Sequence, residues 1–327
     1  MEIGKIEPQF SVVIPLYNKA DTILRTLRSV IRQEFRDFEI VVVDDGSKDN
    51  SAQLVESFDS DVSLHLIRQT NAGVSFARNR GVAESRGRYT AFLDADDEWH
   101  PEFLLELSKI LLKFPNADVI GTDYAYIMND KIVSGKDKNI IEEIDFFDEW
   151  PWRTPINSSS MAIHRDFFVE MGGFNTNFRF YEEAEFLFRL ALKTKFCVSR
   201  RVLSRYNTDA NHRATGSYYN LSDYPHWRMA ENLIENGQEN KDLTKCVVND
   251  LSKSIFGYAR RINTIEIKKM ALAYPIAFSK LFMSNIFKYK ITMVILYPYI
   301  LFVSLLLRLR IMSNLKIVTV NKGVREL

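Results

Sequence analysis

Residues 38–44 read FEIVVVD, and Asp45, Gly46 and Ser47 follow directly. A short apolar run closed by acidic residues and a glycine is typical of a buried strand that ends in a turn. Three other runs of strand length occur in the first hundred residues: Phe10–Pro15 (FSVVIP), Ser63–Arg68 and Arg88–Asp94 (RYTAFLD). The sequence therefore predicts four strands in this part of the chain.

The segments between these runs have helical spacing. Lys19–Phe35 is the clearest case, because apolar residues recur on one of its faces: Ile23, Leu27, Val30 and Ile31. Alternating strands and helices predict an α/β fold with a parallel, doubly wound sheet. Ligands of such sheets bind beyond the carboxyl ends of the strands, so the residues that follow each strand are the candidates for a site.

Small, polar and acidic residues follow all four predicted strands. They are Pro15, Leu16, Tyr17 and Asn18; Asp44, Asp45, Gly46 and Ser47; TNAGVSFARN at residues 70–79; and LDADDEW at residues 93–99. The sequence contains no GxxxxGK loop, and no GxGxxG follows the first strand. A P-loop nucleotide hydrolase and a dinucleotide oxidoreductase are therefore disfavoured.

The acidic cluster after the fourth strand contains Asp94, Asp96 and Asp97. A solvated acidic turn is one interpretation. An EF-hand is excluded, because Trp99 stands where the calcium loop requires glycine. At the end of a central strand, hard carboxylate oxygens can instead hold Mg²⁺ or Mn²⁺, which would stabilise a leaving diphosphate. A metal hydrolase is a weaker alternative, since no nucleophile motif accompanies the aspartates.

The other strand ends allow two interpretations each. Asp44 and Asp45 can accept hydrogen bonds from a base or a ribose, or they can form a turn with Gly46. Gly73 permits close backbone approach, and Arg78 offers a fork for a phosphate or carboxylate. The alternative for Arg78 is an ordinary position on the surface of an amphipathic helix.

Four motifs, SVVIPLYN, VVVDDGSKDN, NAGVSFARNRG and FLDADDEW, occur in an order and spacing that resemble family 2 glycosyltransferases of GT-A fold. The resemblance covers about residues 10–100 strongly, and GGF with the acidic helix start after it extends the match to about residue 192. It implies a Rossmann-like nucleotide-binding half with a mixed central sheet, followed by a C-terminal helical region. It also implies inverting transfer from a nucleotide-diphosphate sugar, most often a UDP-sugar.

The resemblance assigns roles to individual residues. It implies nucleotide-sugar binding by Pro15, Tyr17, Asn18, Asp44, Asp45, Gly73, Arg78, Asp94, Ala95 and Asp96. It implies a divalent cation, Mg²⁺ or Mn²⁺, bound by Asp96 and Asp97, with His212 as a further candidate ligand. A structural or surface position is the alternative for His212.

The resemblance also implies a general base on a second acidic motif, and the matching stretch is YEEAEFLFRL, residues 181–190. Glu185 precedes Arg189 by one turn, the spacing of a surface ion pair. Glu182 and Glu183 stack instead on the apolar side of the helix start, where favourable placement near the helix dipole is the alternative role. We expect Glu183 to be the base, and Glu182 next. Glu183 stands where the family motif usually has aspartate, and its side chain is one methylene longer.

The C-terminal region differs from the rest of the chain. Residues 291–307 form a run of 17 without a charge, interrupted by Pro298, and residues 280–327 hold eight basic residues against one acid. A buried core helix is one interpretation. We expect a tail that associates with the membrane from its cytoplasmic side, through anionic lipid headgroups. The predicted divisions are 1–105 (donor half), 106–215 (acceptor half), 216–284 (helical extension) and 285–327 (tail).

Composition limits the partners and the compartment. The chain has 43 Lys and Arg against 42 Asp and Glu, which argues against a nucleic-acid binder. Two cysteines, Cys197 and Cys246, and no evident signal peptide indicate a reducing, cytoplasmic location. The expected acceptor is a lipid-linked or cell-surface glycan intermediate. The alternative from another class is a non-catalytic subunit that binds sugar nucleotides in a polysaccharide assembly complex.

Overall fold

The computed structural model describes residues 7–128, 131–134, 137–150, 154–178 and 181–207, and short stretches between residues 228 and 247. The chain divides into two compact units, Met1–Ser217 and Tyr218–Leu327, and the fold described below belongs to the first. His212, the tail at 285–327 and most of the 216–284 extension lie outside the described residues. The predicted division of the first unit into two halves stays a prediction.

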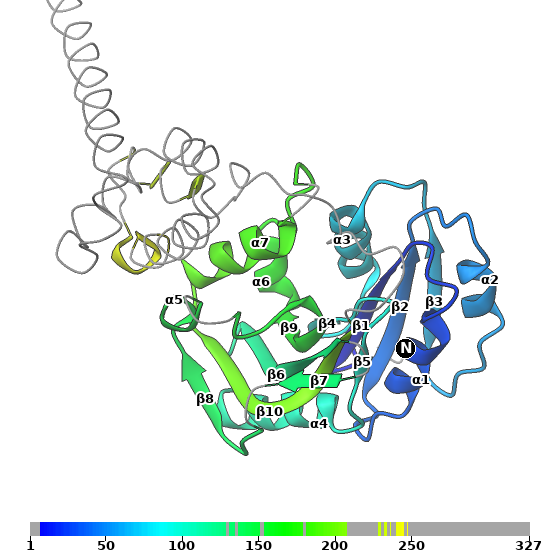
Figure 1. Ribbon diagram of the computed structural model, residues 1–327, viewed down its shortest axis with the longest axis horizontal. Coiled ribbons are helices and arrows are strands. Elements are labelled where there is room, and N and C mark those ends of the chain that lie inside the picture. The colour runs from blue at the N-terminus through cyan, green and yellow to red at the C-terminus, as the bar shows by residue number, and fades with distance from the viewer. Residues whose placement is uncertain are drawn as a thin grey trace, which may run out of the picture. The chain divides into compact units, whose positions relative to one another are not determined.

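A ten-stranded mixed sheet forms the centre of the first unit (Figure 1). Its strands are β1 (Phe10–Leu16), β2 (Phe38–Asp44), β3 (Leu64–Arg68), β4 (Tyr89–Phe92), β5 (Glu98–Trp99), β6 (Val119–Met128), β7 (Lys131–Ser134), β8 (Ile141–Ile144), β9 (Met161–His164) and β10 (Phe196–Asn207). The order is β3-β2-β1-β4-β9-β6-β10-β5, while β7 pairs with β6 and β8 with β10. The first four strands run parallel, and β9 is antiparallel to both its neighbours.

Helices cover both faces of this sheet. They are α1 (Ile23–Ile31), α2 (Ser51–Glu56), α3 (Val74–Glu84), α4 (Phe103–Lys113), α5 (Phe146–Glu149), α6 (Arg165–Glu170) and α7 (Glu182–Ala191), with a short 3-10 helix η1 (Ser158–Ser160). Figure 1 shows α1 and α4 on one side of the sheet and α3, α6 and α7 on the other. Because both faces are covered, the parallel strands are apolar almost throughout, as in FEIVVVD.

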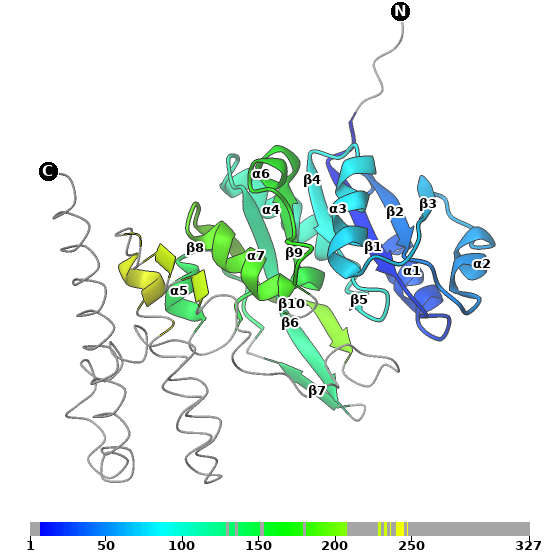
Figure 2. The same cartoon turned by 90° about the horizontal axis from the view of Figure 1, so that it is seen from above.

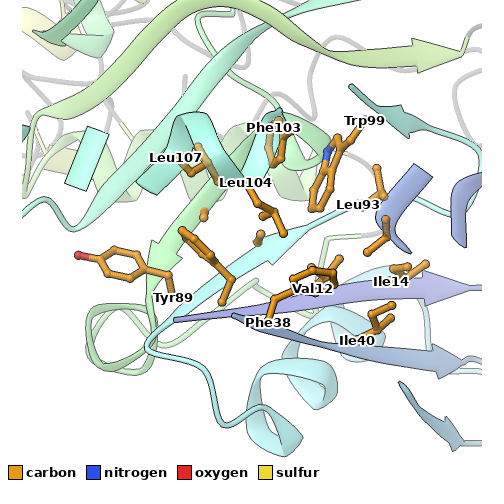
Figure 3. Packing of buried hydrophobic residues seen from close by; sticks show 14 of the residues in the cluster. Val12, Ile14, Phe38, Ile40, Tyr89, Leu93, Trp99, Phe103, Leu104 and Leu107 are labelled. Atoms are coloured by element: carbon orange, nitrogen blue, oxygen red, sulfur yellow. The ribbon is translucent and has the colours of Figure 1, made fainter. Parts of the chain in front are cut away.

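The alternation of β1 side chains supplies both layers of the core. Val12 and Ile14 belong to a fully buried cluster with α1 and α4, and Figure 3 shows them beside Trp99 and Phe103. Val13 points to the opposite face, where a Cβ on Gly81 of α3 would lie 2.3 Å from its Cγ1 atom. Only glycine at this position lets α3 approach β1 so closely.

An aromatic cluster on the α3 side fixes the start of α7. The ring of Phe174 lies 5.4 Å from that of Phe92 in β4 and 4.4 Å from that of Phe186 in α7. Phe168 of α6 packs against Phe92 and Phe186 at 5.8 and 5.3 Å. The side-chain amide of Asn79 donates to the Phe174 carbonyl and accepts from its N–H. These contacts tie α7 to the carboxyl end of β4.

The structure confirms the predicted fold class and adjusts the element boundaries. β4 lies inside the sheet as expected, but it ends at Phe92 rather than Asp94. The first helix covers Ile23–Ile31, within the predicted Lys19–Phe35, and the Lys19 N–H before it donates to Ser51 Oγ. The MGGF segment, residues 171–174, follows α6, and its Gly172 and Gly173 have φ values of +74° and +65°. In the part of the chain that the structure describes, no helix is long and apolar enough to cross a bilayer.

Candidate active site

The ends of β1 and β2 are joined by polar contacts. Asn18 has a φ of +50°, and its N–H donates to Ser47 Oγ at 3.1 Å. The Lys48 N–H donates to Asn18 Oδ1 at 2.7 Å. Pro15 is buried within β1, whereas Tyr17 is 40% exposed just beyond it. Tyr17 is therefore the open residue of the predicted nucleotide-binding set at this strand end.

Asp44 and Asp45 both stabilise loops at the same edge. Asp44 Oδ1 accepts from the Ser47 N–H at 3.0 Å, which is the turn that the sequence left open. Asp45 accepts from the N–H groups of Ala72 and Gly73, both at 2.8 Å. Gly73 has a φ of +100°, and a Cβ there would meet no atom within 4 Å, so open space borders the loop. Any contact of these aspartates with a nucleotide would add to a loop that is already formed.

Arg78 connects the acidic cluster to α7. It is 2% exposed, and its Nη2 atom lies 2.8 Å from Asp94 Oδ1 while Nη1 lies 3.3 Å from Glu182 Oε1. Its guanidinium also lies over the Phe174 ring, 5.0 Å from the centroid. Burial opposes its charge, but Asp94 and Glu182 outweigh it, so the pKa of Arg78 lies above its ordinary value. The guanidinium of Arg78, predicted to bind a phosphate or carboxylate, is thus already paired with two carboxylates of the protein.

Asp94 and Asp96 form the partly exposed edge of the acidic cluster, with the buried Ala95 between them. Asp96 Oδ2 lies 2.6 Å from Lys19 Nζ, and both side chains are mostly buried. The carbonyl of Ala95, which is itself buried, accepts from Thr22 Oγ1 at 2.8 Å. The loop after β4 is therefore held by residues at the start of α1, and Lys19 already balances one of its charges.

Asp97 is completely buried below this edge. Its Oδ1 atom accepts from the Asn207 N–H at 2.9 Å, while Oδ2 has no hydrogen-bond partner among the described residues. Burial, and then the charges of Asp94 and Asp96, raise the pKa of Asp97 well above its ordinary value. The cluster carries more negative charge than its described neighbours neutralise.

The donor chemistry of this cluster suits a divalent cation. Carboxylate oxygens are hard ligands, and a cation would both relieve the repulsion and satisfy Asp97 Oδ2. Within residues 7–207, as far as they are described, no three His, Cys, Asp or Glu side chains converge on a single ligand position. Asp96 and Asp97 stay predicted ligands, and His212 lies outside the described residues.

The three glutamates of α7 differ in their partners, and the predicted ion pair of Glu185 is present but buried rather than on the helix surface. Glu185 is buried and forms a two-pronged ion pair with Arg189, with contacts of 2.6 and 2.9 Å. Glu182 pairs with Arg78, as described above. Glu183 remains partly exposed, and its Oε2 atom accepts from Ser158 Oγ at 2.7 Å. Glu183 is therefore the member of the three without an arginine ion pair among the described contacts.

The pKa of Glu183 suits proton transfer at neutral pH. Burial is the largest cause and raises this pKa to about 7, against the positive charge of Arg78 and the hydrogen bond from Ser158. The negative charges of Asp94 and Glu182 raise it further. A carboxylate with a pKa near the working pH can both accept a proton and release it, which is what a general base requires.

Three residues near this site were not predicted from the sequence: Lys19, Ser158 and Tyr124. Lys19 directly follows the YN of the first motif, so its position was a usable signal. Ser158 belongs to a run of three serines in η1 with no recognisable pattern. Tyr124 lies within β6, and its proximity to Glu183 depends on how the segment at 154–160 crosses the sheet. Ser158 and Tyr124 could be identified only from the folded structure.

Comparison with known proteins identifies the family. The sequence model described as "Glycosyl transferase family 2" matches residues 11–172. The chain contains a family 2 glycosyltransferase domain. This domain has the arrangement of S. aureus TarS residues 1–349 in complex with UDP-GlcNAc, with a TM-score of 0.68 and 20% identity over 81% of this chain and 79% of that one. The likeness to TarS establishes the shared GT-A fold.

Curated relatives resemble the family 2 domain over shorter stretches. An uncharacterized glycosyltransferase, YibD, of Escherichia coli K12 is 40% identical over 106 residues, 32% of this chain and 31% of YibD. A provisionally named teichuronic acid biosynthesis glycosyltransferase, TuaG, of Bacillus subtilis is 35% identical over 111 residues, 31% of this chain and 44% of TuaG. The chain thus spans less than half the length of both relatives. The predicted family and fold are confirmed.

Proposed function

We propose that this protein is an inverting glycosyltransferase that moves a sugar from a UDP-sugar to a hydroxyl of a glycan acceptor. The observation that carries the proposal is Glu183, a partly exposed carboxyl with a pKa of about 7 at the start of α7. It lies beside Arg78 and Asp94, at the sheet edge where ligands of α/β sheets bind. The family 2 domain supplies the reaction class.

The chemistry follows from these positions. The ionised Glu183 takes the proton of the acceptor hydroxyl as its oxygen attacks the anomeric carbon from the side opposite the diphosphate. The bond from the anomeric carbon to the diphosphate oxygen breaks, and UDP leaves with that electron pair. One displacement inverts the anomeric centre, so no second nucleophilic carboxylate is needed. Ser158 and Arg78 hold Glu183 ionised and oriented for this step.

The leaving diphosphate needs positive charge near the acidic cluster. A divalent cation held by Asp96 and Asp97 would neutralise the diphosphate as a Lewis acid. Lys19 is the positive side chain in contact with Asp96, at 2.6 Å, and it can orient the same carboxylate. Tyr17 and the loops of Asp44 and Asp45 would contact the nucleoside.

The relatives support the choice of donor and acceptor. TarS was crystallised with UDP-GlcNAc and also with UDP, and TuaG is provisionally named for teichuronic acid biosynthesis. We extend both properties to this chain, with a UDP-sugar as donor and a lipid-linked or cell-surface glycan as acceptor.

Turnover of UDP-sugars by the full-length protein tests this proposal. With Mn²⁺ present, we expect release of UDP from at least one common UDP-sugar, and a transfer product whose anomeric configuration by NMR is opposite to that of the donor. A retained configuration would contradict inversion. UDP binding without release, across broad donor and acceptor panels, would instead support a non-catalytic sugar-nucleotide-binding subunit.

Membrane association is a separate part of the proposal. It rests on the uncharged run at 291–307 and the basic residues around it, all outside the described residues. Lysine and arginine near a membrane surface each contribute about 1 kcal/mol of attraction to anionic lipid. The full-length protein should sediment with vesicles that contain anionic lipid, and a form that ends at Asn285 should not. Equal partitioning of the two forms would contradict a membrane-associating tail at the cytoplasmic face.

A further inference from the structure

The strands β6 and β10 run side by side (Figure 2) and carry three tyrosines whose rings pack in series. Tyr126 and Tyr206 are register partners, and Tyr124 lies two residues before Tyr126 on the same face of β6. The ring centroids are 5.3 Å apart for Tyr124 and Tyr126, and 5.6 Å for Tyr126 and Tyr206. We call these three residues the tyrosine strip.

The inner end of the tyrosine strip contacts the segment that carries Ser158, the hydrogen-bond donor of the proposed base. The Tyr124 hydroxyl donates to the Thr154 carbonyl at 3.3 Å and lies 3.1 Å from the Tyr126 hydroxyl. Residue 154 begins the segment that leads to Ser158, the hydrogen-bond donor of Glu183. Burial raises the pKa of Tyr124, and the charges of Tyr126 and Glu183 raise it further. Tyr124 therefore lies within electrostatic range of the Glu183 carboxylate.

Exposure differs among the three rings, and the middle ring of the tyrosine strip is the most exposed. Tyr124 is 7% exposed, Tyr206 is partly exposed and Tyr126 is 41% exposed. Tyr126 is thus an open aromatic ring fixed between two others, at the border of the site. The tyrosine strip thus joins the buried ring of Tyr124 to two rings that reach solvent.

We propose that the tyrosine strip binds a sugar ring of the acceptor. A pyranose has a face of C–H groups and a rim of hydroxyls, and tyrosine offers a flat apolar ring with a polar hydroxyl to match both. This inference rests on the proposed function, because it assigns the acceptor side of the same site. Beyond the proposed function, it names a sugar ring as the group that is bound and the three tyrosines as the residues that bind it.

The position of the tyrosine strip favours the acceptor over the nucleotide base. The reacting hydroxyl must come within hydrogen-bond distance of Glu183, so the acceptor ring must lie near it. The base of the donor is separated from the anomeric carbon by the ribose and the diphosphate. In the sheet, β9, β4 and β1 separate β6 from β2, whose end carries the candidate nucleoside ligands Asp44 and Asp45.

Binding of simple sugars to variants of Tyr126 tests the inference. Methyl glycosides of glucose, galactose and N-acetylglucosamine serve as probes, and saturation-transfer NMR of the full-length protein with UDP detects contact with their C–H groups. We expect binding of at least one glycoside, weakened about tenfold by Tyr126→Ala, the order that alanine substitution of a stacking aromatic produces. Tyr126→Phe, which keeps the ring, should retain binding within about threefold.

Two measurements complete the design. Leu112→Ala is the matched control, since Leu112 is 83% exposed on α4 and outside the tyrosine strip; it should bind glycosides as the unaltered protein does. UDP affinity by calorimetry should change less than about twofold in Tyr126→Ala. The inference is overturned if no glycoside binds, if Tyr126→Ala binds glycosides unchanged, or if it loses UDP affinity instead. The proposed function fails on a different result, the absence of UDP-sugar turnover.

Discussion

Ser158→Ala should move the pH dependence of catalysis without removing catalysis. Ser158 Oγ donates to Glu183 Oε2 at 2.7 Å, and this bond favours the ionised carboxylate. A hydrogen bond to a charged group contributes about 1.5–3 kcal/mol, and one pKa unit corresponds to about 1.4 kcal/mol. Because Glu183 is partly exposed, water can replace part of the lost hydrogen bond. We therefore expect the pKa of Glu183 to rise by about one unit, the lower end of this energy range.

The expected result is a shift of the acid limb of kcat/KM. In the unaltered protein kcat/KM should rise with pH through about 7, the pKa of Glu183. In Ser158→Ala the midpoint should lie near about 8, so that kcat/KM at pH ~6 is about tenfold lower and the two profiles meet above pH ~9. The assay is release of UDP from the donor sugar, followed across this pH range.

A matched serine variant controls for general effects. Ser108 Oγ donates to the Leu105 carbonyl on α4 at 2.7 Å, so Ser108→Ala removes a similar bond that does not involve Glu183. Its midpoint should equal that of the unaltered protein. An unshifted midpoint in Ser158→Ala, or one at lower pH, would refute the assignment of the acid limb to Glu183.

Other residues yield predictions of stability and cation dependence. Burial acts to raise the pKa of Glu39, but hydrogen bonds from Ser11 and Arg86 outweigh it and the pKa lies below the usual 4.5. Glu39→Gln should therefore lower the free energy of unfolding by about 1–3 kcal/mol at neutral pH. The difference between the two proteins should disappear as the pH falls through the lowered pKa of Glu39. Chemical denaturation that shows the same difference in unfolding free energy at every pH would contradict this. Gly81→Ala should lower the free energy of unfolding by about 1–3 kcal/mol, because the added methyl group crowds Val13. A raised melting temperature would contradict this prediction. Chelation with EDTA should abolish UDP release until Mn²⁺ is restored, whereas full turnover in EDTA would argue against a required cation.

The parallel half of the fold was predictable because its signal is local. Runs such as FEIVVVD are mainly apolar since both faces of the sheet are covered, and β2 matches its predicted limits. The insertion of antiparallel β9 between β4 and β6 was not predictable. Its pairing joins segments more than 70 residues apart, as in Tyr89 with His164, and a period-two pattern does not specify the partner of a strand.

The candidate site likewise contains contacts that the local sequence predicts and contacts that it does not. The Glu185–Arg189 pair followed from helical spacing alone, and the structure confirms it. The contacts of Arg78 with Asp94 and Glu182 bring together three separately predicted residues, but nothing local indicates that they meet. Ser158 could not be predicted from the sequence, because its contact with Glu183 exists only when η1 packs against β4, β6 and β10.

The central claim is that Glu183 accepts the proton, and its amide variant tests this most directly. Glu183→Gln keeps the size of the side chain but cannot take a proton, so UDP release should fall by about 100-fold or more while UDP affinity stays within about twofold. Glu185→Gln is the matched control, because Glu185 is bound to Arg189 and should retain turnover. Undiminished turnover in Glu183→Gln, with intact UDP binding, would contradict the account.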